Sequence, residues 1–510
     1  MNEWTDGYVA DVGYTFGYYS ELNPASAVLP FLVAGYVPAP EGVHCELGFG
    51  QGLSINLHAA AGGGQWWGTD FNPSQVAFAH ALAHAASGNL ELSDQSFEQF
   101  CTRSDLPDFD SIGLHGIWSW ISEDNRRVVV DFVRRKLKVG GVLYISYNTL
   151  PGWAPFVPMR RLLVEHAESA GAAHGMVKRI DGALDFADQL LTVNAAYLRA
   201  NPQVPERIKQ MRSQSRHYLA HEYFNRDWAP MHFADMGDWL TPAKLSYLCS
   251  AHYADHVPAV NLSAAQQAVL ADIGDPVLRE TVRDFCVNQQ FRRDYWVKGP
   301  RRLARVECIE RLRALRYLLI TPRAAVPSVL PCAQGEASLS HEIYRPMLDA
   351  MADHTPVTLG KLERTLAARG ISLEQIVQGI LLLGGAGHVL RALDDAHIER
   401  CRAGAARINR YLLEEARVTT DIHYLASAVT GGGVPVPHLH QLFLRAINRG
   451  ASAPSAWAQP AWQVLSSLGH GVLRGGVAVT DRDEVLAELG DRAEEFLATR
   501  LPILRALGVV

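Results

Sequence analysis

The residues best placed to do chemistry are two acids and three glycines near the start of the chain. Glu46 ends a short apolar segment, Gly48, Gly50 and Gly52 follow at alternate positions, and Asp70 closes the next apolar segment. A glycine-rich turn between a strand and a helix brings the backbone against a nucleoside, and a carboxylate after the next strand can accept hydrogen bonds from ribose hydroxyls. The glycines remove Cβ atoms where chain and ligand approach closely. This unit therefore predicts a nucleoside-binding site.

The spacing of the glycines indicates which cofactor fits. The dinucleotide fingerprint would need glycine or alanine at position 53, which is Leu53, and the loop has no phosphate-binding lysine. The pattern E-x-G-x-G-x-G that starts at Glu46 resembles the first motif of class I S-adenosylmethionine-dependent methyltransferases. The resemblance implies S-adenosyl-L-methionine as the cofactor and S-adenosyl-L-homocysteine as the product.

Each of the two acids has two possible roles. In a methyltransferase pocket Glu46 would lie near the sulfonium, where a carboxylate favours a cation, and Asp70 would hold the ribose hydroxyls. Without a ligand, Glu46 would cap the turn amides and Asp70 would cap the next helix, a role that Asn72 or Ser74 could also fill. We favour the cofactor roles because the two acids flank the glycine turn.

The surrounding sequence alternates between strand and helix patterns. We predict strands at 43–47, 65–69, 90–92, 109–117 and 142–147, and helices at 53–61, 75–86 and 122–137. This alternation implies an α/β fold, with a parallel, Rossmann-like sheet covered by helices on both faces. Ligands of such sheets bind beyond the carboxyl ends of the strands. Two further strands, at 245–252 and 290–297, are expected to complete the sheet edge.

Side chains at the later strand ends and in an aromatic leader extend the predicted cofactor site. Asp94 could bond the adenine amino group while Phe97 covers a ring face, although Ser-Asp is also common in turns. The leader at 14–24 could form a lid, or else a helix packed on the sheet. The predicted cofactor-binding residues are Tyr14, Tyr18, Glu46, Gly48, Gly50, Gly52, Asp70, Phe71, Asp94, Gln95, Ser96, Phe97 and His115.

The methyl acceptor would meet the cofactor at the ends of the fourth and fifth strands. The predicted catalytic residues are His115, Trp118, Trp120 and Tyr147. Aromatic walls exclude water and attract a sulfonium or an ammonium by cation–π contact, worth ~0.5–2 kcal/mol. Packing in the core is the alternative for either tryptophan. A general base could be His115, His221 or Glu222, and no metal site is predicted.

A narrower resemblance rests on the leader that ends at 21–24, the strand end at 115–120 and the stretch 146–153. These stretches resemble bacterial class I methyltransferases that carry a methyltransferase regulatory domain, which would span residues 217–302. Some relatives with this layout methylate lysines of outer-membrane proteins. The resemblance therefore implies a protein substrate, lysine first, with in-line (SN2) methyl transfer. The alternatives are a small-molecule or glycan O-methyltransferase and a cofactor-sensing regulator that binds DNA.

The chain length of 510 residues suggests two to four domains of roughly 100–200 residues each. We predict a cofactor-binding core at 1–155, a helical insertion and regulatory domain with sheet-completing strands at 156–302, a basic helix and linker at 303–340, a winged-helix-like module at 341–400 and a helical region at 401–510.

Composition argues against several other classes. A net charge of −6 gives no electrostatic footprint for nucleic acid, and the acidic first residues do not form a signal peptide. No apolar run reaches the ~20 residues of a membrane-spanning helix. Seven cysteines without C-x-x-C spacing are typical of reduced thiols. We therefore expect a cytoplasmic protein without membrane insertion; the sequence leaves its oligomeric state open.

Overall fold

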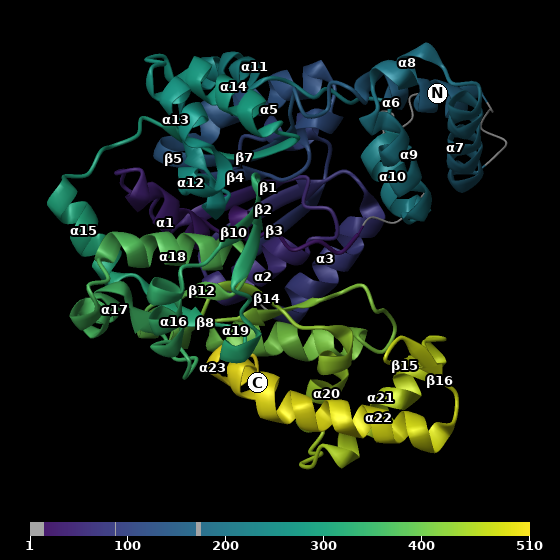
Figure 1. The fold of residues 1–510 in the computed structure, drawn as a ribbon, viewed down its shortest axis with the longest axis vertical. Helices are drawn as coiled ribbons and strands as arrows, with labels where there is room; N and C mark the ends of the chain where they lie inside the picture. Colours follow the sequence, from purple (N-terminus) through teal and green to yellow (C-terminus); the bar gives the residue numbers. More distant parts are fainter. Residues whose placement is uncertain (1–14, 87, 170–174) are drawn as a thin grey trace.

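The computed structural model describes residues 15–86, 88–169 and 175–510. Its centre is a seven-stranded sheet in the order β3-β2-β1-β4-β5-β7-β6, in which β7 runs antiparallel to both neighbours (Figure 1). The strands are β1 (Val43–Leu47), β2 (Gln65–Asp70), β3 (Leu90–Asp94), β4 (Phe109–Leu114), β5 (Leu137–Asn148), β6 (Leu245–Ser250) and β7 (Phe291–Lys298). The predicted α/β fold with a Rossmann-like sheet is confirmed, including the two late strands at its edge.

Helices cover both faces of the sheet, because successive residues of a strand point to opposite sides. On β5, Val142 and Tyr144 pack in the same cluster as α1, whereas Leu143 and Ile145 pack in that of α5. The helices around the sheet are α1 (Pro24–Val33), α2 (Leu53–Gly62), α3 (Pro73–Ala86), α4 (Phe97–Cys101), α5 (Glu123–Lys136) and α11 (Phe233–Leu240), and α12 (Pro258–Asn261), α13 (Ala264–Ala271) and α14 (Pro276–Val287) connect β6 to β7.

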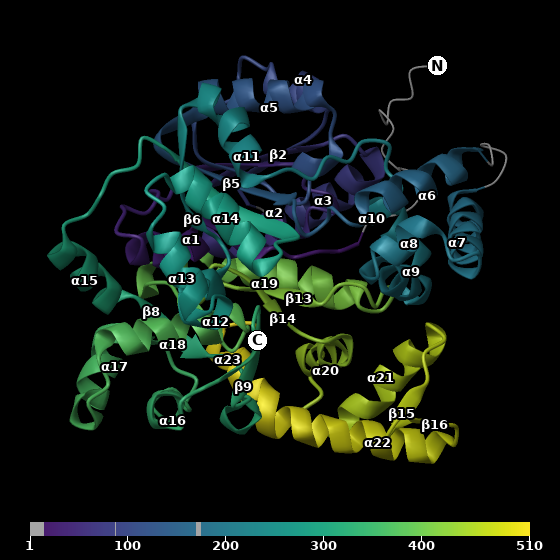
Figure 2. The ribbon, with the colours of Figure 1, turned by 45° about the horizontal axis from the view of Figure 1, so that its top comes forward.

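Five helices between β5 and α11 form a lobe at one side of the molecule (Figure 2). They are α6 (Val157–Ser169), α7 (Met176–Thr192), α8 (Ala196–Ala200), α9 (Gln203–Ser213) and α10 (Arg216–Tyr223). Their buried faces share a core of their own that includes Leu163, Leu184 and Ile208. The lobe therefore has a hydrophobic core separate from that of the sheet, as an insertion requires.

The region after the sheet differs from the prediction in two places. In the segment 303–340, expected to be a basic helix and linker, the helix ends at Ala314, and residues 316–319 form a strand whose apolar side chains are buried between two other strands. The linker part of this segment contains a β-hairpin. The elements are α15 (Arg305–Ala314), β8 (Arg316–Leu319), β9 (Val329–Cys332), β10 (Gly335–Ser338), α16 (His341–Asp349), β11 (Val357–Thr358), α17 (Leu359–Leu366), α18 (Leu373–Gly385) and β12 (Val389–Ala392).

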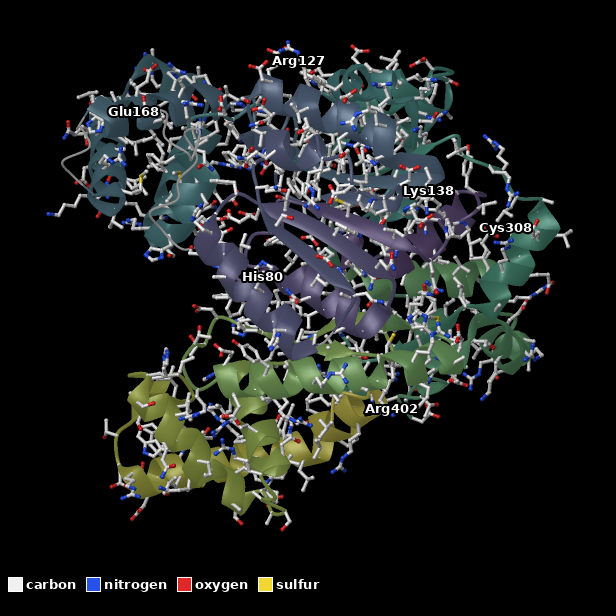
Figure 3. All side chains as sticks on the ribbon, turned by 180° about the vertical axis from the view of Figure 1, so that it is seen from behind. His80, Arg127, Lys138, Glu168, Cys308 and Arg402 are labelled. Atoms are coloured by element: carbon white, nitrogen blue, oxygen red, sulfur yellow. The ribbon has the colours of Figure 1, made fainter. Side chains whose placement is uncertain are left out.

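The C-terminal region packs directly on the sheet domain. Its long helix α19 (Asp395–Glu415) lies against α2 and α3, and the hairpin of β13 (Tyr424–Ser427) and β14 (Gly432–Pro435) also contacts α2. Leu57 and Leu82 of the sheet domain share one buried cluster with this region. Figure 3 shows this helix, marked by Arg402, beneath the sheet domain.

The last helices follow the hairpin of β13 and β14. They are α20 (His438–Asn448), α21 (Ser455–Ser467), α22 (Arg482–Glu495) and α23 (Leu501–Ala506), and a small hairpin of β15 (Val472–Arg474) and β16 (Val477–Val479) lies between α21 and α22. Helices α21 and α22 lie at the far end of the molecule from the sheet (Figure 2). Helices α22 and α23 are separated by a π-helical turn at Phe496–Arg500. Pro502 follows this turn and lacks the backbone N–H that a continuous helix would use.

Within the described ranges, no single helix combines the length and apolar character needed to cross a bilayer. One pair of helices, Leu359–Arg369 and Leu373–Gly385, meets the length and composition test only when taken together, and it is bent by 118°.

The contact between α19 and α2 leads to a stability prediction. A Cβ added at Gly404 of α19 would lie 2.7 Å from the carbonyl oxygen of Ala60 in α2. Although alanine normally stabilises a helix by about 1 kcal/mol over glycine, Gly404→Ala is expected to lower the free energy of unfolding by about 1–3 kcal/mol. Gly490→Ala in α22, where the added Cβ meets no atom within 4 Å, is the matched control and should stabilise. Urea-unfolding midpoints measure both variants, and equal stabilisation would contradict the close packing.

Candidate active site

A pocket lies beyond the carboxyl ends of β1, β2 and β4, the edge that the sequence predicts. Glu46 and Asp70 line it from the first two strands and His115 from the residue after the third. Its wall consists of Tyr19, Glu46, Gly48, Phe49, Gly50, Asp70, Phe71, Gln75, Gln95, Ser96, Phe97, Glu98, His115, Gly116, Ile117, Trp120, Ile121, Ser122, Asn125 and Asp227. The pocket thus combines the glycine turn with Tyr19 before it and with four later segments of the chain.

The glycine turn forms the floor of this pocket for steric reasons. Gly48 and Gly52 have φ values of +74° and +70°, which side chains rarely adopt. A Cβ on Gly48 would lie 2.5 Å from the Ile117 side chain, and one on Gly52 would lie 2.5 Å from Cβ of Ala79 in α3. The first glycine therefore permits the pocket wall to close, and the last permits α2 to pack on α3.

Asp70 braces the turn from the end of β2. Its Oδ2 accepts a hydrogen bond from the Gly50 backbone N–H at 2.9 Å, and its Oδ1 accepts one from the Asn72 N–H at 3.0 Å. Its exposed fraction is 6%, and burial raises its pKa to about 6. Asn72 itself accepts from the Ser74 N–H, so the cap of the next helix does not depend on Asp70.

Glu46 lies next to Asp70 and is still more buried, with 3% exposure. Burial and the neighbouring Asp70 carboxylate raise its pKa to about 8. Its Oε2 has no hydrogen-bond partner among the described residues. Two adjacent buried carboxyl groups favour a ligand that carries positive charge and N–H or O–H donors.

The donor set fits S-adenosylmethionine. Its sulfonium and ammonium groups would compensate the two acids, and its ribose hydroxyls could donate to Asp70. The Gln95 side-chain oxygen is buried without a partner in the described structure, and it lines the same pocket. An adenine amino group is a donor of the kind that this oxygen lacks. The residues present therefore offer acceptors for the ammonium, ribose hydroxyl and adenine amino groups of the cofactor.

His115 forms a wall of the pocket. Its ring stacks on Tyr19 with centroids 3.6 Å apart, and its Nδ1 lies 2.7 Å from the Tyr144 hydroxyl. Burial lowers the pKa of His115 to about 4. The imidazole is therefore neutral near pH 7 and a weak base there.

Two residues predicted to be catalytic lie in the core. Trp118 is 0% exposed and donates its indole N–H to Sδ of Met231 at 3.3 Å. Tyr147 is 1% exposed and donates to Asp294 at 2.9 Å, within a buried network around Arg292. Neither lines the pocket, because each side chain points into the hydrophobic cluster beneath α5 and α11. The structure thus corrects their predicted position at the pocket.

Two predicted cofactor residues are also corrected. Tyr18 is covered by the β14 hairpin and bonds His58 at 3.2 Å, so its neighbour Tyr19 lines the pocket instead. Asp94 is exposed and does not line the pocket, although it lies in register with Asp70. Tyr14 lies outside the described residues.

The remaining predicted residues have definite positions. Phe71, Gln95, Ser96 and Phe97 line the pocket, and Ser96 also forms a capping box with Gln99 at the start of α4. The other two base candidates, His221 and Glu222, lie on α10 and do not line this pocket. Burial raises the pKa of Glu222 to about 7.

Sequence reasoning missed Asp227, which comes from far along the chain. The Ala229 N–H donates to the Ser119 carbonyl at 2.8 Å and holds this segment against the end of β4. Trp228 stacks on Trp120 with centroids 6.0 Å apart and planes inclined by 30°. No local pattern signals Asp227; only its place beside Trp228, within the stretch of the regulatory resemblance, could have drawn attention to it.

Comparison with known proteins now adds to this geometry. Residues 215–298 match the family described as a predicted methyltransferase regulatory domain. The Synechocystis protein sll1526 is 38% identical over 512 residues, covering 99% of each chain. PKMT2 from Rickettsia typhi in complex with AdoHcy superposes with a TM-score of 0.69 at 18% identity, covering 97% of this chain and 99% of that chain. A second structure of PKMT2 gives a TM-score of 0.68 at 19% identity.

The chain belongs to the same family as sll1526, carries the predicted methyltransferase regulatory domain and has the fold of PKMT2. The matched domain covers α10 to β7 and so supplies both Asp227 and the strands at the sheet edge. RP789 of Rickettsia prowazekii is a shorter match, 27% identical over 257 residues, which covers 48% of this chain and 44% of that protein.

Asp70 and Asp94 offer a matched pair for a binding test. Asp70→Asn removes one acceptor position and the negative charge, which is expected to weaken S-adenosylmethionine binding about 10- to 100-fold, or roughly 1.5–3 kcal/mol. Asp94→Asn, at the same level of the next strand, is expected to change the Kd less than about twofold. Isothermal titration calorimetry measures both. Equal losses in the two variants would contradict the assigned position of the ribose.

Proposed function

We propose that the protein is a protein-lysine N-methyltransferase. The observation that carries the proposal is an aromatic and acidic rim on the cofactor pocket, made by Trp120, Trp228 and Asp227. Trp120 and Asp227 both line the pocket. An aromatic face beside a carboxylate attracts an alkylammonium group, which suits a lysine side chain.

The tryptophan rings in and beside this rim differ in which cations already lie over them. The guanidinium of Arg160 lies 5.2 Å from the Trp228 ring centre, and that of Arg207 lies 4.2 Å from the Trp153 ring centre. Among the described residues, no guanidinium lies over Trp120. We therefore assign Trp120 as the ring that the acceptor contacts.

Two buried donors favour a polypeptide acceptor over a small molecule. The indole N–H groups of Trp153 and Trp228 are buried and have no acceptor within the described structure. The two rings meet edge to face, with centroids 5.3 Å apart. Peptide carbonyl oxygens would satisfy these donors, since buried N–H groups are costly when unpaired. The regulatory domain would then hold the substrate chain beside the pocket.

Methyl transfer requires the protein to position the methyl donor and the acceptor, and it requires the acceptor amine to be deprotonated. S-adenosylmethionine, when bound, supplies an activated methyl group. Gly48, Gly50 and Gly52 would admit the cofactor, Asp70 would hold its ribose, and Phe71, Gln95, Ser96 and Phe97 would surround its adenine. Orientation of the donor and acceptor for in-line transfer can supply ~7–11 kcal/mol of the barrier. A lysine with a free pKa of ~10.4 must lose a proton, and low polarity around Trp120 would lower that pKa.

The direct test is to incubate the full chain with methyl-labelled S-adenosylmethionine and fractions of bacterial protein. We expect label on lysine Nζ atoms by tandem mass spectrometry. Label confined to small molecules or to hydroxyl groups would overturn the proposal in favour of an O-methyltransferase. The cytoplasmic location expected from the cysteines is likewise a prediction, to be checked by cell fractionation.

Asp227 gives a variant that separates substrate binding from cofactor binding. Asp227→Asn is expected to raise KM for the polypeptide about 10-fold, since 1.4 kcal/mol is a factor of ten, with little change in the Kd of S-adenosylmethionine. Asp131→Asn on α5, where the carboxylate pairs with Arg134 and Arg135 outside the pocket, is the control. An unchanged KM in Asp227→Asn would contradict a role for this acid in holding the ammonium.

A further inference from the structure

A second cavity lies between the sheet edge and the region that follows residue 315. Its walls come from residues 18–26, from 251–253 after β6 and from Arg293 of β7. The opposite wall is formed by Tyr317 of β8, the end of α18 and residues 389–391 of β12. None of its lining residues lines the cofactor pocket. The cavity is therefore a separate space at the junction of the methyltransferase sheet with the module that follows it.

Two polar groups in this cavity are buried without a well-formed hydrogen bond to the protein. The Tyr317 side chain is 1% exposed, and its hydroxyl lies beside that of Tyr253 but makes no hydrogen bond of standard length and angle among the described residues. Arg391 donates from Nη1 to the Ala25 carbonyl at 2.8 Å, but its buried Nε–H has no acceptor in the described structure. Both groups can donate, so they fit a ligand that carries hydrogen-bond acceptors.

The charge of the cavity is unbalanced. Arg293 forms an ion pair with Glu21, which is the one carboxylate among the lining residues. His252, also in the wall, faces Asp255 at 3.5 Å. Arg391 has no carboxylate within 4 Å in the part of the chain that the structure describes. A partly buried guanidinium without a counter-charge favours an anion, because desolvation of an unpaired charge is costly.

The leader links this cavity to the cofactor pocket. Tyr19 lines the pocket and stacks on His115, while Ser20 and Glu21 line the cavity. The Glu21 carbonyl accepts a hydrogen bond from the Tyr295 hydroxyl at 2.9 Å, and its carboxylate pairs with Arg293. An anion that drew Arg293 away from Glu21 would release the segment that holds Tyr19 in place.

We propose that this cavity binds a small anion, through its phosphate or carboxylate group, at Arg391 and Tyr317, and that its occupancy alters cofactor binding through residues 19–21. The anion site itself is independent of the methyl acceptor. Its coupling to the cofactor rests on the S-adenosylmethionine pocket proposed above. By thermodynamic linkage, each ligand must then change the affinity of the other by the same factor.

The binding test uses the full chain and two probes, inorganic phosphate and malonate. Isothermal titration calorimetry is expected to give saturable binding of at least one probe in about the millimolar range. Tighter phosphate binding would assign a phosphate-bearing ligand, and tighter malonate binding a carboxylate. Arg391→Met and Tyr317→Phe are expected to weaken binding at least about 10-fold and about 3-fold, respectively. Arg402→Met, on the exposed side of α19 (Figure 3), should leave it unchanged.

The outcomes separate this inference from the proposed function. No saturable binding of either probe, or equal binding in wild type and Arg391→Met with native thermal unfolding, would overturn the anion site. Coupling is measured as the Kd of S-adenosylhomocysteine with and without a saturating amount of the bound probe. An unchanged Kd would overturn the coupling, whereas failure of S-adenosylhomocysteine to bind in either case would count against the cofactor pocket instead.

Discussion

Two carboxyl groups buried side by side at the ends of β1 and β2 set the requirement that the whole site must meet. Burial raises the pKa of both Glu46 and Asp70, and the Asp70 carboxylate raises that of Glu46 further. The unpartnered Oε2 of Glu46 leaves one buried acceptor unsatisfied within the described structure. Asp70 accepts a hydrogen bond from the Gly50 N–H, so the same acid holds the turn in shape and faces the ligand. A sulfonium cofactor with ribose hydroxyls would compensate the charge of the buried carboxyl groups and donate hydrogen bonds to their oxygens. Cofactor binding is therefore coupled to the ionisation of these two acids.

The regions outside the sheet contribute side chains and packing contacts to this site. The regulatory domain contributes Asp227 and Trp228 to the rim and two strands to the sheet, so it cannot be removed without opening the sheet edge. The C-terminal region packs α19 on α2, the helix that begins at the glycine turn. A change in either region can therefore reach the cofactor through packed elements, and the anion cavity at Arg391 lies on one such path.

Local patterns were sufficient to predict the parts of the fold that local geometry controls. The strand, turn and helix around Gly48 to Gly52 followed from glycine spacing, and the pocket edge followed from strand polarity. The sequence does not determine which way a side chain at a strand end points. For this reason Tyr147 and Trp118 were assigned to the pocket, although they point into the core. The prediction of Tyr18 as a cofactor residue missed by one position, because Tyr19 lines the pocket. Strand β8 looked like the end of a basic helix because its pairing partners lie about 40 and 70 residues away, beyond the range of any local pattern. Asp227 depended on tertiary contacts alone.

The proton balance of cofactor binding tests the central claim most directly. With a pKa of about 8, Glu46 is mostly protonated at pH 7 in the free protein, and a bound sulfonium and ammonium would favour its ionised form. Titration of S-adenosylmethionine at pH 7 in HEPES and in Tris, whose ionisation enthalpies differ, measures the protons exchanged. The account predicts a release that approaches about one proton per site in the wild type and is lost in Glu46→Gln. Binding heats that do not depend on the buffer, or the same release in both proteins, would contradict it.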